Sequence, residues 1–147
     1  MKLAIGSDHA AYLRKAELSD LLRSWGHEVL DLGTHSEESC DYPDFAHAVA
    51  VAVTEGAADR GVLICGTGLG MSMAANHHPG IRAALCTSPE LARLSREHND
   101  ANIICMGART QTLEEMETIL QIWFDTPFEG NRHQRRVRKI DRILPEE

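Results

Sequence analysis

The chain has 147 residues, of which 43% are hydrophobic and 25% are charged, and its formal net charge is −7. This length fits one domain with a hydrophobic core, so we predict a single domain over residues 1–147. The negative charge argues against a nucleic-acid partner, and neither a long apolar stretch nor a signal-peptide pattern is present, so no membrane span is expected.

The N-terminal half alternates short apolar runs with helical patterns. Leucines and a tryptophan recur at the helical period after the first apolar run, which predicts a helix there. A polar loop is then expected before a helix rich in alanine and valine. In chain order, the predicted elements are a strand at 3–5, a helix containing Leu18 to Trp25, a strand at 29–32, a loop at 34–41 and a helix from Tyr42 to about Ala58.

The C-terminal half repeats this alternation. Two spacings of the form Thr-x-x-Glu, at 87–90 and 112–115, predict capping boxes that start helices. Strands are predicted at 61–65, 82–86 and 102–106, with helices at 71–76, from 87, from 112, and from after Gly130 to about Leu144. Five strands with helical crossovers predict an α/β fold. We therefore expect a doubly wound, Rossmann-like parallel sheet with a C-terminal helix.

The most informative stretch reads Gly-Val-Leu-Ile-Cys-Gly-Thr-Gly-Leu-Gly over residues 61–70. A glycine-rich turn between a strand and a helix presents backbone N–H groups and the positive end of a helix dipole to an anion. Cys65 ends the strand beside those donors, which would stabilise its thiolate. Met71 stands where a dinucleotide motif needs glycine, and no P-loop lysine follows. The spacing favours an anion-holding turn with a neighbouring nucleophile or base over a plain tight turn.

Polar side chains follow the predicted strands at their carboxyl ends, where doubly wound sheets bind ligands. His98 and Asn99 instead precede the fifth strand, so they belong at the opposite edge, roughly 16 Å from that strand's far end. Arg132 begins at this opposite edge too, because the helix before it returns there. If His98, Arg132 and Cys65 share one site, that site must be assembled between subunits. The residues at the carboxyl ends are Asp8, His9, Thr34, Cys65, Thr67, Thr87 and Arg109.

Several of these residues also have a simpler interpretation. On spacing alone, His98 is more simply a helix-end residue that complements the helix dipole. Asp8 can cap the first helix, and Tyr42 can be a packing residue. A basic run near the C-terminus is usually a solvated helix face, although Arg132 and Arg136 lie one turn apart and can clamp a phosphate.

Neither a metal site nor a disulfide is expected. The four cysteines form no C-x-x-C pair, which predicts a reducing, cytoplasmic location. The remaining histidines show no metal-binding spacing and are interpreted as surface or structural groups. They are His27, His35, His47, His77 and His78.

Together these motifs resemble a sugar-phosphate isomerase family, whose members include type B ribose-5-phosphate isomerases and galactose-6-phosphate isomerase subunits. The resemblance spans nearly the whole chain, in the family's order. The matching segments are Gly6–His9, Leu32–Thr34, Asp41–Pro43, Ile64–Gly70, Ala75–Asn76, Gly80–Ala83, Glu97–Asp100, Gly107–Arg109 and Arg132–Arg136.

The resemblance implies interconversion of ribose 5-phosphate and ribulose 5-phosphate through an enediolate, with no metal or organic cofactor. It assigns Cys65 as the base and His98 as the ring-opening group, with Thr67 and Asp8 assisting proton transfer. It also implies a homodimer or a dimer of dimers with sites shared between subunits. The implied binding residues are Gly66, Gly68 and Gly70 for the enediolate, His9, Arg109, Arg132 and Arg136 for the phosphate, and Tyr42 and Asn99 for the sugar.

Three positions depart from the family pattern. Some members carry a glutamate base where this chain has Met71, so Cys65 is the only candidate base. Ala11 stands where glycine is common, and His77 where lysine is common. A six-carbon substrate such as allose or galactose 6-phosphate remains an alternative. A non-catalytic phosphate-binding module and a cysteine hydrolase using Cys65 with His98 are the rival functions.

Overall fold

The computed structural model describes residues 1–142 and contains one five-stranded sheet with the order β2-β1-β3-β5-β4. Every neighbouring pair is parallel, which confirms the predicted doubly wound α/β fold. The order itself was not predicted, because strand neighbours are chosen by packing between distant segments. The strands are β1 (Lys2–Ser7), β2 (Glu28–Asp31), β3 (Arg60–Cys65), β4 (Ala83–Leu85) and β5 (Ile103–Gly107).

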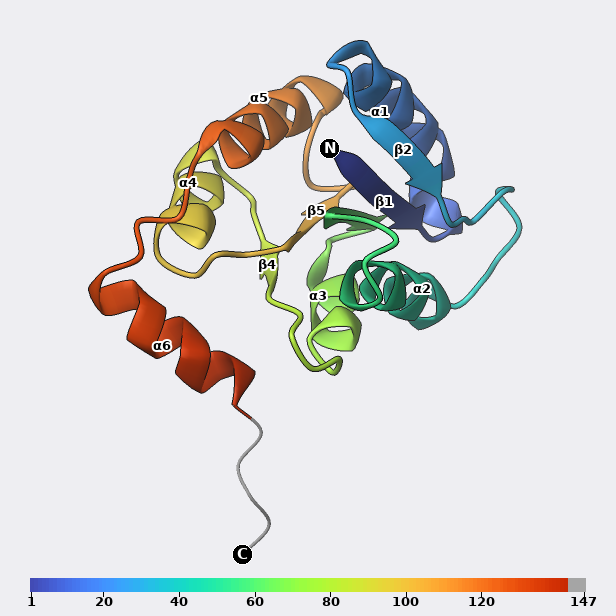
Figure 1. Ribbon diagram of the computed structural model, residues 1–147. Coiled ribbons are helices and arrows are strands. Elements are labelled where there is room, and N and C mark those ends of the chain that lie inside the picture. The colour runs from blue at the N-terminus through green and yellow to red at the C-terminus, as the bar shows by residue number, and fades with distance from the viewer. Residues whose placement is uncertain (143–147) are drawn as a thin grey trace, which may run out of the picture.

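Helices cover both faces of the sheet. Figure 1 shows α1, α4 and α5 on one face and α2 and α3 on the other, while α6 stands outside both layers near the end of α4. Within the described residues, no helix combines the length and the apolar character that crossing a membrane requires. The helices are α1 (Tyr12–Ser24), α2 (Tyr42–Thr54), α3 (Leu69–Ala75), α4 (Pro89–Glu97), α5 (Leu113–Asp125) and α6 (Arg132–Asp141), with a short 3₁₀ helix, η1 (His9–Ala11).

The sheet separates two apolar cores. Side chains of a strand point alternately to opposite faces, so Val62 and Ile64 of β3 join the core under α1, α4 and α5. Leu63 and Cys65 join the core under α2 and α3. Burial on both faces explains why β3 is an unbroken apolar run. The same alternation places the sulfur of Cys65 on the side of α3.

Several helix boundaries differ from the predictions, and α3 spans Leu69–Ala75 where 71–76 was predicted. Gly56 has a left-handed φ of 78° directly after Glu55, the C-cap of α2, so this helix ends at Thr54 and not near Ala58. The predicted capping box at Thr87 is wrong, because the cap of α4 is the next residue, Ser88, whose side chain accepts the N–H of Leu91.

The second predicted capping box is confirmed at the start of α5. The N–H of Glu115 donates to the Thr112 side chain, and the N–H of Thr112 donates to the Glu115 carboxylate. Two backbone donors are thereby satisfied reciprocally.

The C-terminal helix α6 is held to the body of the protein at few points. His133 and Val137 are buried, at 4% and 3% exposure, while the four arginines and one lysine of α6 face solvent. Nη1 of Arg82 donates to both carboxylate oxygens of Asp141, each at 2.9 Å. The predicted extension of this helix to about Leu144 lies outside the described residues.

Candidate active site

Cys65 lies inside the glycine-rich turn that the sequence singles out. Its side chain is buried, and the N–H of Gly68 donates to its Sγ atom at 3.1 Å. The N–H of Leu69 donates to Oγ1 of Thr67 at 3.3 Å. The turn therefore places the Cys65 sulfur against one backbone N–H and next to others, which are the donors that bind an anion.

Two glycines of this turn leave no room for a side chain. Gly68 has a φ of 83°, and a Cβ there would lie 2.6 Å from Cδ1 of Leu85 and 3.0 Å from the backbone carbonyl of Met106. A Cβ on Gly70 would lie 2.5 Å from the ring of Tyr42. The turn is therefore pressed between β5 and the Tyr42 ring, so Tyr42 does pack, and it packs on the site.

Alanine should be tolerated differently at these two glycines. Gly68→Ala is expected to lower the free energy of unfolding by at least about 2 kcal/mol, because left-handed strain adds to overpacking against backbone. Gly70→Ala should cost less than about 1 kcal/mol, because Tyr42 is 40% exposed and its ring can rotate into solvent. Urea unfolding of the two variants measures the difference. Equal costs would contradict this description of the turn.

Three further predicted residues lie at the same edge as Cys65, Thr67 and Tyr42. Oδ1 of Asp8 accepts the N–H of Ala11 at 3.3 Å, so Asp8 caps η1 and keeps its second carboxylate oxygen for other partners. Nδ1 of His9 accepts the N–H of Cys40 at 3.1 Å. The Arg109 side chain lies along the turn, since a Cβ on Gly66 would be 3.4 Å from its Cδ. We call Asp8, His9, Tyr42, Cys65, Thr67 and Arg109 the carboxyl-edge group.

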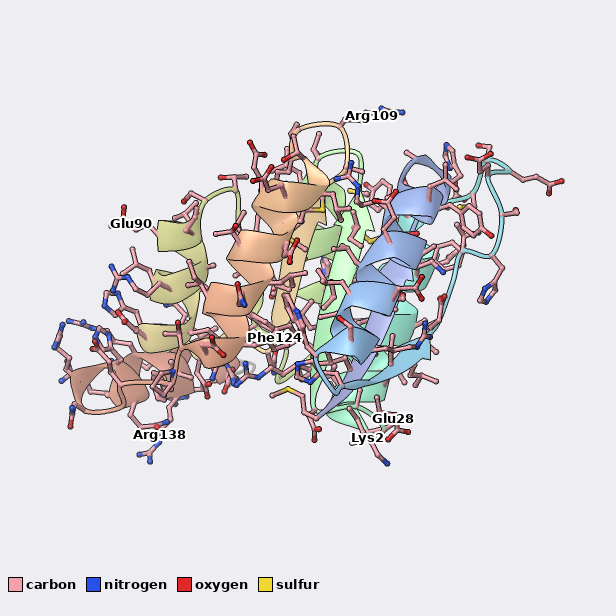
Figure 2. All side chains as sticks on the ribbon, turned by 90° about the horizontal axis from the view of Figure 1, so that it is seen from above. Lys2, Glu28, Glu90, Arg109, Phe124 and Arg138 are labelled. Carbon is pink, nitrogen blue, oxygen red and sulfur yellow. The ribbon has the colours of Figure 1, made fainter. Side chains whose placement is uncertain are left out.

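The other predicted residues lie at the opposite edge. His98 is the C-cap of α4, and its N–H donates to the carbonyl of Leu94. Figure 2 shows Arg138 of α6 at the end of the molecule opposite to Arg109. Within one chain the candidate residues therefore lie at two opposite edges of the sheet, as the strand directions predict. We call His98, Asn99, Arg132 and Arg136 the opposite-edge group.

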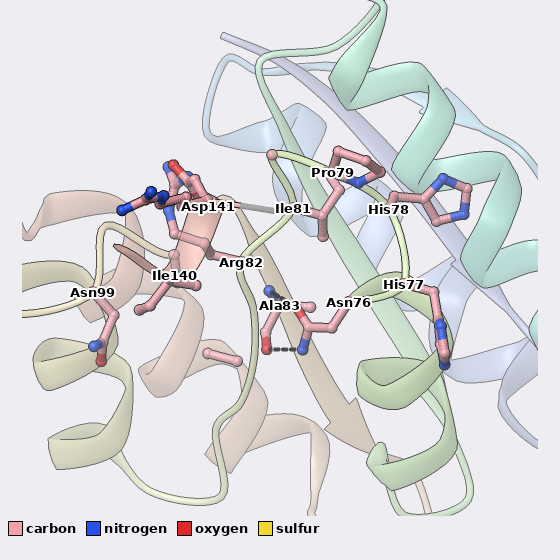
Figure 3. Close-up of a pocket in the computed structure, with 14 residues that line it drawn as sticks. Asn76, His77, His78, Pro79, Ile81, Arg82, Ala83, Asn99, Ile140 and Asp141 are labelled. Atoms are coloured by element: carbon pink, nitrogen blue, oxygen red, sulfur yellow. Dashed lines mark hydrogen bonds and ion pairs between the residues drawn. The ribbon is translucent and has the colours of Figure 1, made fainter. Parts of the chain in front are cut away.

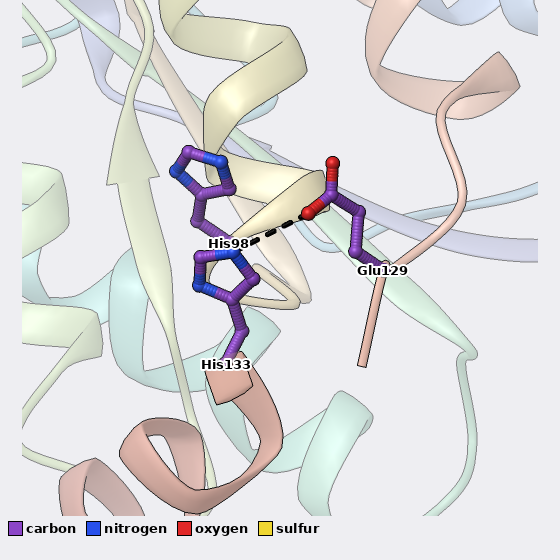
Figure 4. A group of neighbouring side chains, drawn as sticks. All are labelled: His98, Glu129 and His133. Atoms are coloured by element: carbon purple, nitrogen blue, oxygen red, sulfur yellow. Dashed lines mark ion pairs between the residues drawn. The ribbon is translucent and has the colours of Figure 1, made fainter. Parts of the chain in front are cut away.

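His98 has two close neighbours that the sequence analysis missed as site residues. Its ring stacks on that of His133, with centroids 4.2 Å apart and an interplanar angle of 14° (Figure 4). Oε2 of Glu129 lies 3.3 Å from Nε2 of His133. Burial, together with the nearby cations Arg132 and Arg136 and with His98, lowers the pKa of His133, although Glu129 opposes this. His133 lies inside the Arg132–Arg136 motif, and this position in the sequence could have identified it as a site residue.

His98 and the two side chains beside it are three possible metal ligands. Ligand atoms of His98, Glu129 and His133 all lie within 4.8 Å of one another. However, two nearly parallel imidazoles direct their nitrogen lone pairs alongside each other, whereas a tetrahedral metal needs lone pairs that converge. The arrangement suits ring stacking better than metal coordination.

A pocket of about 450 Å³ adjoins the opposite-edge group, between the segment before β4 and the end of α6 (Figure 3). Asn99 and Arg82 line it, together with Asp141. Arg82 is paired with Asp100 at 3.5 Å and with Asp141 at 2.9 Å, so its charge is already neutralised. Arg82 is therefore not a candidate ligand for a phosphate.

Comparison with known proteins agrees with these motifs. Residues 3–140 match the family described as Ribose/Galactose Isomerase. Ribose-5-phosphate isomerase B of Escherichia coli is 47% identical over 142 residues, which cover 97% of this chain and 95% of that protein. The structure of ribose-5-phosphate isomerase B from Clostridium thermocellum is 55% identical, with a TM-score of 0.95, and covers 96% of this chain and 95% of that one.

A second solved structure gives the same result. The ribose 5-phosphate isomerase of Thermotoga maritima is 52% identical, with a TM-score of 0.93, over 95% of this chain and 97% of that chain. The similarity extends along nearly all of the sequence, and the glycine turn lies within the matched region. The chain therefore belongs to the ribose/galactose isomerase family.

Proposed function

We propose that this isomerase interconverts ribose 5-phosphate and ribulose 5-phosphate. The observation that carries the proposal is the position of the Cys65 Sγ atom, which accepts the Gly68 N–H at 3.1 Å within the glycine-rich turn. Moving a proton between neighbouring carbons of a sugar needs a base and donors for the oxyanion that forms. The family's description, which names ribose and galactose, is in keeping with this chemistry.

In the proposed reaction the Cys65 thiolate removes the proton from C2 of the open-chain aldose. The C2–H bond electrons form the C1–C2 double bond, and the negative charge moves to the C1 oxygen, beside the amides of the turn. The thiol then returns the proton to C1, while Thr67 and Asp8 move a proton from the C2 oxygen to the C1 oxygen. Met71, where some family members carry a glutamate, is fully buried in the core under α3, which leaves Cys65 as the base.

The substrate phosphate is assigned to His9, Arg109, Arg132 and Arg136. Within residues 1–142, none of these three arginines forms an ion pair, whereas Arg82 and Arg96 are paired with carboxylates. Unpaired guanidinium groups can bind a dianion bidentately without first losing another partner. Asn99 and Tyr42 are assigned to the sugar.

We propose that each site takes the carboxyl-edge group from one subunit and the opposite-edge group from another, in a homodimer or a dimer of dimers. Mixing Cys65→Ala subunits with His98→Asn subunits tests this. In an isologous dimer, random pairing restores about one quarter of the sites. Hybrids that form, as judged by mass, and stay inactive would overturn the shared site.

The reaction itself is tested by incubating ribose 5-phosphate in D₂O and following conversion and deuterium uptake. Deuterium in the product is expected, because the proton on sulfur can exchange with solvent before it returns. A non-catalytic binding module would give neither product nor label. A cysteine hydrolase would instead give a burst on an ester substrate.

The size of the sugar is tested separately. Side-by-side kcat/KM values should favour the five-carbon aldose phosphate over allose and galactose 6-phosphate. The reverse order would assign a six-carbon substrate to the same site, as the family's description allows. The four free cysteines fit the cytoplasmic location that we also propose.

A further inference from the structure

We propose that His133 and Glu129 are positioning residues that fix the ring plane of His98 for opening the sugar ring. The inference rests on the proposed function, in which His98 exchanges protons with the ring oxygen of the furanose. It starts from the stacked pair of imidazoles, whose planes differ by 14° at a centroid distance of 4.2 Å (Figure 4).

Within residues 1–142, the stack on His133 is the contact that can orient the ring of His98. Among the described residues its ring forms no hydrogen bond, and its backbone sits at the C-cap of α4, where the helix ends. A partly exposed histidine in such a position can turn about both side-chain torsions. Stacking on a fixed neighbour restricts the ring of His98 to one plane.

His133 is the fixed member of the pair. Its side chain is only 5% exposed, and Oε2 of Glu129 lies 3.3 Å from its Nε2, a buried nitrogen that forms no hydrogen bond within the described residues. Glu129 is held in turn, because its N–H donates to the carbonyl of Glu97 at 3.1 Å. Glu97 directly precedes His98 in the chain. The segment that carries His133 is thus hydrogen-bonded to Glu97, the residue that precedes His98.

Charge is consistent with this division of roles. Burial of His133, together with nearby Arg132, His98 and Arg136, lowers its pKa, while Glu129 opposes this. A neutral ring can stack on His98 without repelling the proton that His98 must carry during ring opening. The cluster therefore offers one proton carrier and one aromatic support.

Two assays separate ring opening from proton transfer at carbon. Ribulose 5-phosphate is acyclic, because its 5-oxygen is esterified, so exchange of its C1 hydrogen with D₂O needs the Cys65 step but no ring opening. Conversion of furanose ribose 5-phosphate needs both steps. His133→Ala should slow conversion about 10- to 100-fold and leave the exchange rate within about threefold of the unmodified protein.

Two variants distinguish support by a ring from proton transfer by His133. His133→Phe keeps a flat ring and should convert ribose 5-phosphate within about threefold of the unmodified rate. Glu129→Gln should slow conversion but not exchange, whereas Glu117→Gln, on the exposed face of α5, should change neither. Glu129→Gln keeps the volume of the side chain, so it remains informative if His133→Ala does not fold.

Three outcomes would overturn the proposal. They are equal losses of conversion and exchange in His133→Ala, unchanged conversion in that folded variant, and a His133→Phe variant as slow as His133→Ala. Absence of exchange in the unmodified protein would instead overturn the proposed function, so the two failures are distinguishable.

Discussion

Replacement of Cys65 by alanine is expected to lower kcat/KM for ribose 5-phosphate by about 10²- to 10⁴-fold, the range attributed to a positioned base. Exchange of the C1 hydrogen of ribulose 5-phosphate should fall by the same factor, because both reactions need the sulfur. Phosphate binding should persist, since the ligands proposed for it are arginines and His9. Coupled kinetics, NMR exchange in D₂O and calorimetric titration with an unreactive sugar phosphate measure the three quantities.

Cys86→Ala is the matched control for this variant. Cys86 is fully buried, and burial raises the pKa of its thiol to about 11, so it stays protonated at neutral pH. Its removal should lower stability through a small cavity and leave the exchange rate unchanged. Exchange that survives in Cys65→Ala would refute Cys65 as the base.

Asp31→Asn should destabilise the fold by about 3 kcal/mol, because it leaves a buried ammonium group unpaired. Nζ of Lys15 lies 2.5 Å and 2.7 Å from the two carboxylate oxygens of Asp31, and the Lys15 side chain is only 2% exposed. Lys15→Met should cost less, since the carboxylate that it leaves behind is 31% exposed and can be hydrated. Denaturant unfolding of both variants measures this asymmetry.

The ion pair also predicts how stability depends on pH. Burial alone would raise the pKa of Asp31, but hydrogen bonds from Lys15 and Gly33 and the charge of Lys15 outweigh it, so the pKa lies below its ordinary value of 3.8. The stabilisation is therefore fully present above pH 3.8 and is lost as the pH falls through the lower, folded-state pKa. The stability gap to Asp31→Asn should close there, and a gap that persists in acid would contradict the assignment.

The fold was predictable wherever local patterns decide it. The unbroken apolar run of β3 and the helical period of α1 both follow from burial on the sheet. Strand order could not be read in this way. Thr87 and Ser88 both have side chains that can cap a helix, and the backbone conformation at the start of α4 places Ser88 at the N-cap.

The candidate site divides in the same way. The contact between Cys65 and the Gly68 amide joins residues three positions apart, so the motif alone pointed to it. The stack of His98 on His133 joins the end of α4 to the start of α6. This contact depends on how the segment after α5 packs against α4, and the spacing of residues in the sequence does not determine that packing.

The hydrogen bond between the Cys40 N–H and His9 Nδ1 determines the tautomer of that imidazole. A peptide nitrogen can only donate, so Nδ1 must hold its lone pair and the ring hydrogen must sit on Nε2. Nε2 of His9 is thereby left free to donate to an oxyanion, which suits the phosphate-binding role proposed for this residue. The loop that bears Cys40 would then help to orient the imidazole toward the anion.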